Sequence, residues 1–225
     1  VDAICHVVRC FDDDNITHVE GRVDPLADID TINLELVLAD LESINKRYAR
    51  VAKVAKTKDK DAVAELAVLD KIKPVLEEGL SARSIEFTEE EQKIVRGLFL
   101  LTTKPVLYVA NVAEDDVANA EENPYVKSVK EFAESEHAEV IVISARAEEE
   151  IAELDDEDKA EFLEALGIEE SGLDQLIRAA YDLLGLATYF TAGEQEVRAW
   201  TFRKGIKAPQ AAAVSYTHLT LPTIA

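Results

Sequence analysis

The sequence predicts an α/β protein with a parallel sheet that is interrupted by a long helical hairpin. Two observations carry this prediction. Short, nearly continuous apolar runs alternate with segments of helical periodicity, which is the order of elements in a parallel sheet with right-handed crossovers. Between the first two runs lies a long stretch whose apolar residues recur every three and four positions, as on the face of a helix.

Composition limits the classes of function. The 225 residues are 48% hydrophobic and 31% charged, which is enough apolar material for a core, and the length favours one or two domains. The 46 Asp and Glu outnumber the 24 Lys and Arg, giving a net charge of −22. This balance excludes nucleic-acid binding through overall basicity and leaves a local basic patch open, so we expect no DNA partner. No run of eighteen apolar residues occurs, so we expect no membrane association.

The first predicted elements are a strand and two long helices. Ala3 to Phe11 (AICHVVRCF) predicts a buried strand, and a polar loop over 12–27 follows it. A turn over 57–61 then separates two helices, the second ending near Gly79. On the first helix, one heptad register would place Asn45 in the seam, where it could fix the pairing. That register comprises Leu34, Leu38, Leu41, Asn45, Tyr48, Ala52 and Ala55, and a second comprises Val37, Leu41, Ile44, Tyr48, Val51 and Ala55.

The rest of the chain returns to alternating strands and helices. Thr88 opens a capping box that predicts a helix start, and Pro105 ends that helix. After Gly185 the composition indicates a small β-containing domain. The remaining elements are expected in this order: a strand at 106–112, a helix near 125–135, a strand at 139–144, helices near 157–166 and 172–184, and strands at 188–192 and 197–202.

Two polar corners end the second and third predicted strands. One is Asn111-Val112-Ala113-Glu114, and the other is Ser144-Ala145-Arg146. In doubly wound sheets, ligands bind outside the carboxyl ends of the strands, where an amide and a carboxylate can hydrogen-bond a purine edge. N-x-x-E alone is weak, because a helix-capping turn explains it equally, but the two motifs in this order are more specific. We expect a nucleotide-binding site formed by Asn111, Val112, Glu114, Ser144, Ala145 and Arg146.

Charge is distributed unevenly. Residues 111–175 carry 22 acidic and 4 basic side chains, whereas residues 43–60, at the tip of the hairpin, carry seven basic side chains and one acidic one. A basic tip can steer one end of an acidic molecule toward phosphate, and a solvated helix face explains the same pattern. We expect a partner-binding surface formed by Lys46, Arg47, Arg50, Lys53, Lys56, Lys58 and Lys60. No metal site is predicted, because the four His and two Cys lack ligand spacing.

Several longer segments resemble the YchF/Obg-like ATPase family of P-loop proteins. These segments are residues 2–11, 28–50, 104–112, 188–193, 197–205 and 207–212. The resemblance implies a partial Ras-like P-loop NTPase core, an inserted helical coiled-coil hairpin and the start of a C-terminal TGS β-domain. It divides the chain into a partial nucleotide-binding domain (1–27), the coiled-coil insertion (28–102), the base-recognition half of the nucleotide-binding domain (103–185), the TGS start (186–212) and a probable non-native tail (213–225).

The resemblance also implies a function. It implies hydrolysis of ATP with Mg²⁺, association with the ribosome or ribosomal RNA, and a cytoplasmic location. In related GTPases the base motif is Asn-Lys-x-Asp. Here Val112 takes the place of the Lys and Glu114 that of the Asp, so we expect ATP to be bound and GTP to be bound more weakly.

We expect the chain to be an N-terminally truncated fragment. It opens on Val1, holds no Met, and contains no G-x-x-x-x-G-K-[S/T] phosphate loop. The switches and Mg²⁺ ligands of the family are expected in the missing part, so no catalytic residue can be named, and the fragment alone should be inactive. Two alternatives stay open: a non-enzymatic module that contacts the ribosome or RNA through the basic hairpin, and an acidic α/β protein without activity.

Overall fold

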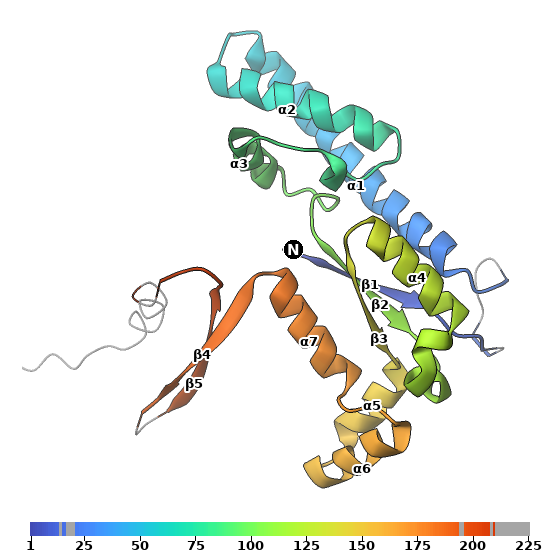
Figure 1. Ribbon diagram of the computed structural model, residues 1–225. Helices are drawn as coiled ribbons and strands as arrows, with labels where there is room; N and C mark the ends of the chain where they lie inside the picture. The colour runs from blue at the N-terminus through green and yellow to red at the C-terminus, as the bar shows by residue number, and fades with distance from the viewer. Residues whose placement is uncertain (14, 17–20, 194–195, 208, 210–225) are drawn as a thin grey trace, which may run out of the picture.

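The computed structural model of the chain describes residues 1–13, 15–16, 21–193, 196–207 and 209. Its centre is a parallel sheet of three strands in the order β1 (Ile4–Arg9), β2 (Val106–Asn111) and β3 (Glu139–Ile143) (Figure 1). The middle strand β2 is buried along almost its whole length, since it has a neighbour on each side and helices on both faces. The α/β fold with a parallel sheet is confirmed.

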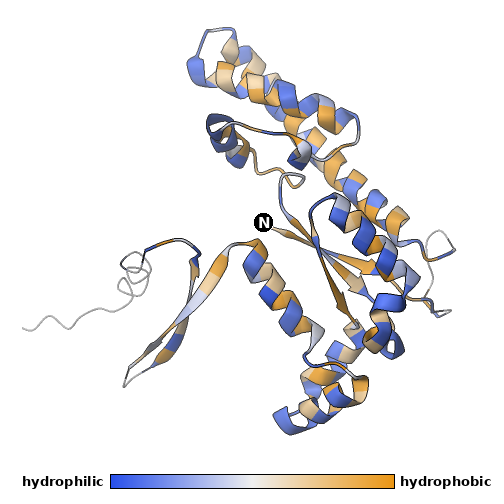
Figure 2. Ribbon diagram, viewed as in Figure 1, coloured by the Kyte–Doolittle hydropathy of each residue, from blue (hydrophilic) through white to orange (hydrophobic). Residues whose placement is uncertain are grey.

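Helices cover both faces of this sheet. α1 (Pro25–Ala55) and α4 (Pro124–Ser135) lie on one face, and α7 (Gly172–Leu183) packs on β2 and β3 from the other (Figure 1). The strands are the most continuously apolar part of the chain (Figure 2). On the first face, side chains of the sheet, α1 and α4 form one core that includes Val8, Ile29, Tyr108, Val126 and Val129.

A second core lies in the helical insertion. α1 runs on past the sheet and pairs with α2 (Lys60–Glu77), and the short turn η1 (Ala82–Ser84) and α3 (Glu89–Leu98) lead back to β2 (Figure 1). The capping box predicted at Thr88 starts α3. This core is built from Val37, Ile44, Val51, Val68, Leu69, Ile72, Leu76, Ala82, Val95 and Leu100, among others.

The packed face of α1 follows the second of the two registers read from the sequence. Val37, Ile44 and Val51 are buried, whereas Leu34 and Leu38 are 49% and 54% exposed. The prediction that Asn45 lies in the seam is wrong, because this side chain is exposed. Both registers are similarly apolar, so the sequence of one helix did not distinguish them; the position of α2 and of residues 100–102 did.

α1 also begins earlier than expected. Asp24 is its N-cap and accepts a hydrogen bond from the Ala27 backbone N–H (3.2 Å), and Pro25 occupies the first helical position. The expected loop over 12–27 is therefore three residues too long. Proline is favoured at this position because the N–H that it lacks would have no partner inside the helix.

Two short helices after the strand corners were not predicted. η2 (Glu114–Glu122) follows β2, and α5 (Ala145–Glu153) follows β3, while α6 (Asp156–Leu166) lies close to its expected position. Their acidic sequences carry few apolar residues, so they gave almost no periodic signal. Asp and Glu in the first turn of each are favourable, since they face the positive end of the helix dipole.

A separate two-stranded sheet lies near the end of the described part of the chain. β4 (Leu186–Ala192) and β5 (Val197–Arg203) pair antiparallel, and Trp200 is buried there. That this hairpin begins a TGS domain stays a prediction, and the expected tail at 213–225 lies outside the described residues. None of the described helices is both long enough and apolar enough to cross a membrane.

The two cysteines occupy different environments. Cys5 is exposed and Cys10 is buried, and both are free thiols. Burial raises the pKa of the Cys10 thiol to about 12. A buried, protonated thiol is a poor nucleophile, so Cys10 acts as a core side chain rather than a reactive group.

His6 is a buried titratable group of β1. Only 8% of it is exposed, and its ring lies 5.5 Å from that of Tyr108. Burial lowers the pKa of His6 below its ordinary value; Asp28 opposes this shift, Arg83 adds to it and Glu136 opposes it. His6 is therefore a core side chain of β1.

The lowered pKa of His6 predicts a pH dependence of folding. In the unfolded chain His6 has its ordinary pKa of about 6.5, so below this pH the unfolded chain binds more protons at His6 than the folded chain does. The free energy of unfolding therefore falls as the pH decreases from about 6.5 toward the lower pKa of the folded state. We expect His6→Gln to lose less free energy of unfolding than the unmodified chain between pH 7 and pH 5.5. Urea titrations at several pH values measure this, and parallel losses in both proteins would contradict it.

Candidate functional site

The two polar corners meet at the carboxyl edge of the sheet. β2 and β3 are adjacent and parallel, and the Val112 backbone N–H extends their pairing by donating to the Ile143 carbonyl (2.8 Å). The Asn111 side-chain Oδ1 accepts a hydrogen bond from the Ala145 backbone N–H at 2.9 Å. This contact joins the first residue of one corner to the middle residue of the other, across 34 positions of sequence.

A charged triad lies beside that contact. The Arg146 Nε lies 3.7 Å from the Glu114 carboxylate and 3.7 Å from the Glu150 carboxylate. Arg146 is 78% exposed at its side chain, and Glu114 is 29% exposed. The guanidinium thus lies between two carboxylates, and the partly buried Glu114 is held only by an exposed partner, an ion pair of small energy.

Two predicted site residues belong to the framework. Val112 is 2% exposed and packs in the core that faces α1 and α4. Ser144 is also 2% exposed, and its hydroxyl caps α5 by accepting from the Ala147 backbone N–H. Neither side chain is open to a ligand in this chain, so direct contacts are left to Asn111, Glu114, Arg146 and the Ala145 backbone.

The available hydrogen-bonding groups define what the corner can recognise. Glu114, when ionised, is an acceptor, and it can take a proton donor such as an exocyclic amino group. The Ala145 backbone N–H could donate a hydrogen bond to an oxo group of a ligand, but it already donates to Asn111. The Nδ2 of Asn111 can donate, because its amide oxygen is the atom facing Ala145. This pattern suits a flat heterocycle with an amino group.

The basic tip surrounds the turn between α1 and α2. Asp59 caps α2 by accepting from the Ala62 backbone N–H (2.9 Å), and Lys58 adopts a left-handed conformation with φ 62°. Two of the seven basic residues are neutralised within the hairpin, Lys46 by Glu42 and Arg47 by Glu65. Within the described part of the chain, no ion pair involves the other five, which are Arg50, Lys53, Lys56, Lys58 and Lys60.

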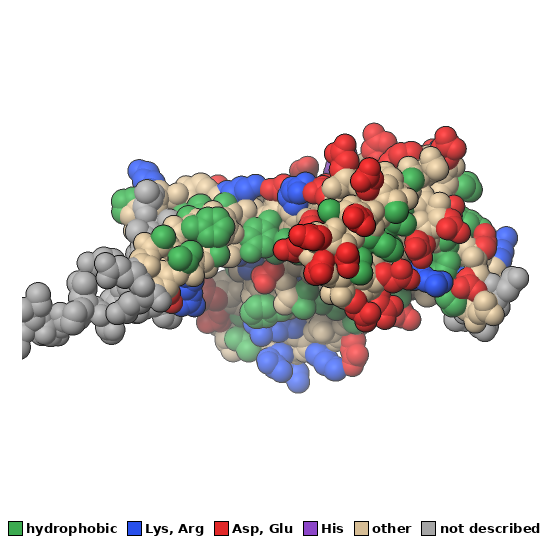
Figure 3. All heavy atoms as spheres, turned by 90° about the horizontal axis from the view of Figure 1, so that it is seen from below, with side chains coloured by type: hydrophobic (Ala, Val, Ile, Leu, Met, Phe, Trp, Pro, Cys, Tyr) green, Lys and Arg blue, Asp and Glu red, His purple; other side chains and the backbone are tan. Residues whose placement is uncertain are grey.

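The acidic residues gather at the opposite end of the molecule. α5 and α6 lie at the bottom of Figure 1, with the tip of the hairpin at the top. Seen from below, this end is crowded with Asp and Glu side chains (Figure 3). At ordinary salt, exposed charges farther apart than about 10 Å are largely screened from each other. The acidic end therefore repels an anionic partner at the basic tip less than the net charge of −22 suggests.

The donor set does not fit a metal site within the described residues. In that part of the chain, no group of three or more His, Cys, Asp or Glu side chains is placed to hold a metal ion. The carboxylates at the corner are engaged by Arg146 instead. We therefore assign no residue of this chain to the Mg²⁺ that the resemblance implies.

Sequence reasoning missed two polar clusters that join distant segments. Asp40 on α1, 3% exposed, accepts hydrogen bonds from the Leu101 and Thr102 backbone N–H groups (2.9 and 2.7 Å) and from the Thr102 hydroxyl (2.7 Å). Glu136, after α4, accepts from the Tyr108 hydroxyl (2.7 Å) and from Arg83. Single polar residues in such positions carry no periodic or motif signal.

The sheet and its converging corners define the class: an α/β protein with a parallel sheet whose polar corners meet at the carboxyl ends of neighbouring strands. Over 217 residues the chain is 64% identical to a protein of Bacillus subtilis (strain 168) named ribosome-binding ATPase YchF. The chain belongs to the YchF family. The match covers 96% of the chain and 59% of that relative, so the chain spans a little over half of the relative's length.

Further comparisons agree with this assignment. A protein of Escherichia coli O157:H7, also named ribosome-binding ATPase YchF, is 52% identical over 216 residues, again 96% of the chain and 59% of the relative. The solved structure of the Schizosaccharomyces pombe YchF GTPase matches with a TM-score of 0.83 at 37% identity, over 97% of the chain and 59% of that structure. Residues 186–221 match the family YchF-GTPase_C, described as a protein of unknown function (DUF933). The domain boundaries and the tail expected at 213–225 stay predictions.

Proposed function

We propose that the chain is the base-recognising and partner-contacting part of a ribosome-associated, cytoplasmic protein that binds and hydrolyses ATP, and GTP less well. The proposal of nucleotide binding rests on the contact between Asn111 and Ala145, which brings the two corners together at the carboxyl edge of the sheet. The names of the relatives, ribosome-binding ATPase and GTPase, support the activity and the partner. When bound with the nucleotide, Mg²⁺ would supply charge neutralisation at the phosphates.

The preference for adenine follows from the corner's donors and acceptors. Adenine offers a 6-amino group that can donate to the Glu114 carboxylate, whereas guanine offers an oxygen there. The backbone donor that would suit this oxygen, the Ala145 N–H, is already used by Asn111. A purine that enters must also displace Arg146 from Glu114, which costs little because the pair is exposed.

We expect Glu114→Ala to abolish the difference between ATP and GTP binding. Weak binding is measured by titrating ¹⁵N-labelled chain with each nucleotide and following the Ala145 amide and the Asn111 side-chain amide. Loss of one hydrogen bond to the partly buried Glu114 carboxylate should weaken ATP binding about tenfold and leave GTP binding nearly unchanged. The matched control is Glu150→Ala, which removes the other carboxylate from Arg146 and should retain the preference. If Glu114→Ala kept the preference, base recognition would lie elsewhere.

The isolated chain is expected not to turn over ATP. Its 225 residues contain no G-x-x-x-x-G-K-[S/T] loop, and phosphoryl transfer depends on such positioning and charge-neutralising groups. Phosphate release with Mg²⁺ and ATP should equal that of a chain-free blank. Turnover above the blank that persisted in an independently purified preparation would overturn this expectation.

A second candidate function is contact with ribosomal RNA without enzymatic activity. The five basic residues without an ion pair in the described chain favour it, since a polyanion binds by replacing counterions at such side chains. The two functions are compatible, and they separate by mutation. Changes at Glu114 should alter nucleotide choice, and changes at the tip should alter ribosome binding.

A further inference from the structure

The protein has two cores, and α1 connects them. We call residues 37–104 the hairpin body and residues 4–29 with 105–183 the sheet body. α1 contributes Ile29 to the core of the sheet body and Val37, Ile44 and Val51 to the core of the hairpin body. No other described helix contributes buried residues to both cores.

The part of α1 between the cores is only lightly packed, with Asn33 and Leu36 half-buried. Residues 30–36, nearly two turns, contain no buried side chain. At its start the Thr31 hydroxyl donates to the Ala27 carbonyl (2.8 Å), a contact that competes with the helical hydrogen bond and favours bending. A helix bends where a side chain intrudes on its own hydrogen bonds and where tertiary packing does not hold it straight.

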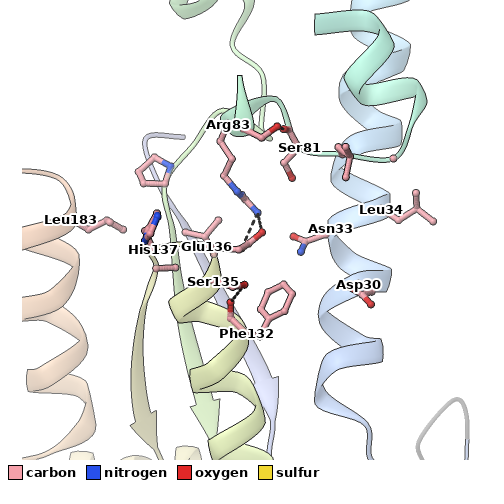
Figure 4. A pocket seen from close by; sticks show the side chains of 16 residues that line it. Asp30, Asn33, Leu34, Ser81, Arg83, Phe132, Ser135, Glu136, His137 and Leu183 are labelled. Atoms are coloured by element: carbon pink, nitrogen blue, oxygen red, sulfur yellow. Dashed lines mark hydrogen bonds and ion pairs between the residues drawn. The ribbon is translucent and has the colours of Figure 1, made fainter. Parts of the chain in front are cut away.

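An open cavity lies beside this span. Its volume is about 790 Å³, and it is lined from α1 by Asn33 and Leu34, from the turn after α2 by Ser81 and Arg83, and from the end of α4 by Glu136 (Figure 4). It lies at the amino-terminal edge of the strands, near Pro105, at the opposite edge from the two polar corners. The two bodies are therefore not closely packed at this junction, so they have room to approach or separate.

One ion pair crosses the junction. The Arg83 guanidinium of the hairpin body reaches both carboxylate oxygens of Glu136 in the sheet body at 3.3 Å (Figure 4). Glu136 is held in turn by the hydroxyl of Tyr108, a fully buried residue of β2. The side chains of Arg83 and Glu136 are 19% and 27% exposed, so the pair is largely removed from water.

We propose that the Arg83–Glu136 pair is a latch that holds the hairpin body at a fixed angle to the sheet body, and that its opening lets the hairpin swing about residues 30–36 of α1. Each body keeps its own core during this motion. The Asp40–Thr102 contact lies within the hairpin body and moves with it. The latch thus sets the position of the basic tip, which α1 carries at its far end.

The end of α4 that carries the latch is linked to the opposite edge of the sheet. At the start of α4, the Asn123 side-chain amide donates to the Cys10 carbonyl (3.1 Å), and the Tyr125 hydroxyl donates to Asp12 (3.1 Å). Both contacts lie in the loop after β1, at the carboxyl edge. A displacement of that loop would be transmitted along a rigid helix to Glu136.

Distances between spin labels test the latch. One label is placed on the hairpin body (Ala49→Cys) and one on α4 (Glu131→Cys), both exposed positions, with Cys5→Ser as background; Cys10 is buried and does not react. In Arg83→Met and in Glu136→Gln we expect a distance distribution about twofold wider than in the parent, because a junction with few packed contacts opens locally. The control is Arg47→Met, which breaks the Arg47–Glu65 pair inside the hairpin body and should leave the distribution unchanged.

Each outcome decides the question. Distributions in Arg83→Met and Glu136→Gln that match the parent, with native circular dichroism, would overturn the proposal, as would equal broadening in Arg47→Met. If both variants fail to fold, Glu136→Asp is measured instead, because its shorter side chain keeps the charge but withdraws the carboxylate from Arg83. Broadening in this variant supports the latch, and an unchanged distribution contradicts it. None of these measurements requires nucleotide or ribosomes, so the result does not depend on the proposed function.

Discussion

Asp40→Ala is expected to destabilise the protein by about 3–5 kcal/mol, the largest effect we expect of any single substitution on the free energy of unfolding. The carboxylate accepts three hydrogen bonds from Leu101 and Thr102 in a site that is almost completely buried. Removing it leaves these donors without a partner and without water. Asp40→Asn should also be harmful, because its amide NH₂ would face N–H donors.

The loss has a structural location. Thr102 also bonds the segment after α2, by accepting from the Arg83 backbone N–H (3.0 Å) and the Ala82 backbone N–H (3.2 Å). Asp40 therefore organises the base of the hairpin body through two layers of contacts. Urea unfolding followed by circular dichroism measures the effect, with Glu35→Ala, an exposed acidic residue of the same helix, as control. A loss in Asp40→Ala no larger than in Glu35→Ala would show that the buried carboxylate is dispensable.

Reversing three charges at the tip is expected to produce the largest effect on partner binding. In the variant Lys53→Glu, Lys56→Glu and Lys58→Glu, each phosphate contact is replaced by repulsion. Cosedimentation with bacterial ribosomes should weaken at least tenfold at moderate salt, and the slope of log K against log salt should flatten by about 2–3. These lysines have no ion pair within the described residues, so the change breaks no internal pair there.

A matched variant separates local from overall charge. Lys127→Glu, Lys130→Glu and Lys159→Glu change the net charge by the same amount on helices of the sheet body, although Lys130 and Lys159 also lose surface ion pairs with Glu121 and Asp174. We expect this variant to bind ribosomes nearly as the parent does. Equal weakening in both variants would mean that the acidic total, rather than the tip, controls binding, and the tip would lose its assigned role.

Much of the fold could be predicted because it depends on local patterns. The runs around Val8, Val109 and Ile141 are short and apolar, which fits strands buried in a parallel sheet, and the heptad-like spacing on α1 fits a long helix. Pro25 carried a helix-start signal that was interpreted as part of a loop. The acidic helices η2 and α5 were missed because helices with few apolar residues leave little periodicity.

The candidate site was predicted in outline. Asn111 and Ala145 stand at the ends of adjacent strands, and the parallel order of the sheet brings strand ends together, so the convergence of the two corners followed from sequence. The burial of Val112 and Ser144 did not, because whether a corner residue faces the core or solvent depends on the twist of the strand and on what covers it. The pairing of Arg47 with Glu65 of α2 likewise required the position of both helices, whereas Lys46 and Glu42 lie four residues apart on α1.

By itself, the sequence determined the α/β class, the inserted helices, the two polar corners and the basic tip, since each is encoded by residues close together in the chain. Only the tertiary structure decided which face of α1 packs and which basic side chains of the tip have no ion pair in the described part of the chain. It also decided how Asp40 holds the base of the hairpin body and how Glu136 joins the two bodies. Contacts such as Arg83–Glu136 link residues 53 positions apart, and their energy depends on burial and distance that arise only when the whole chain has folded.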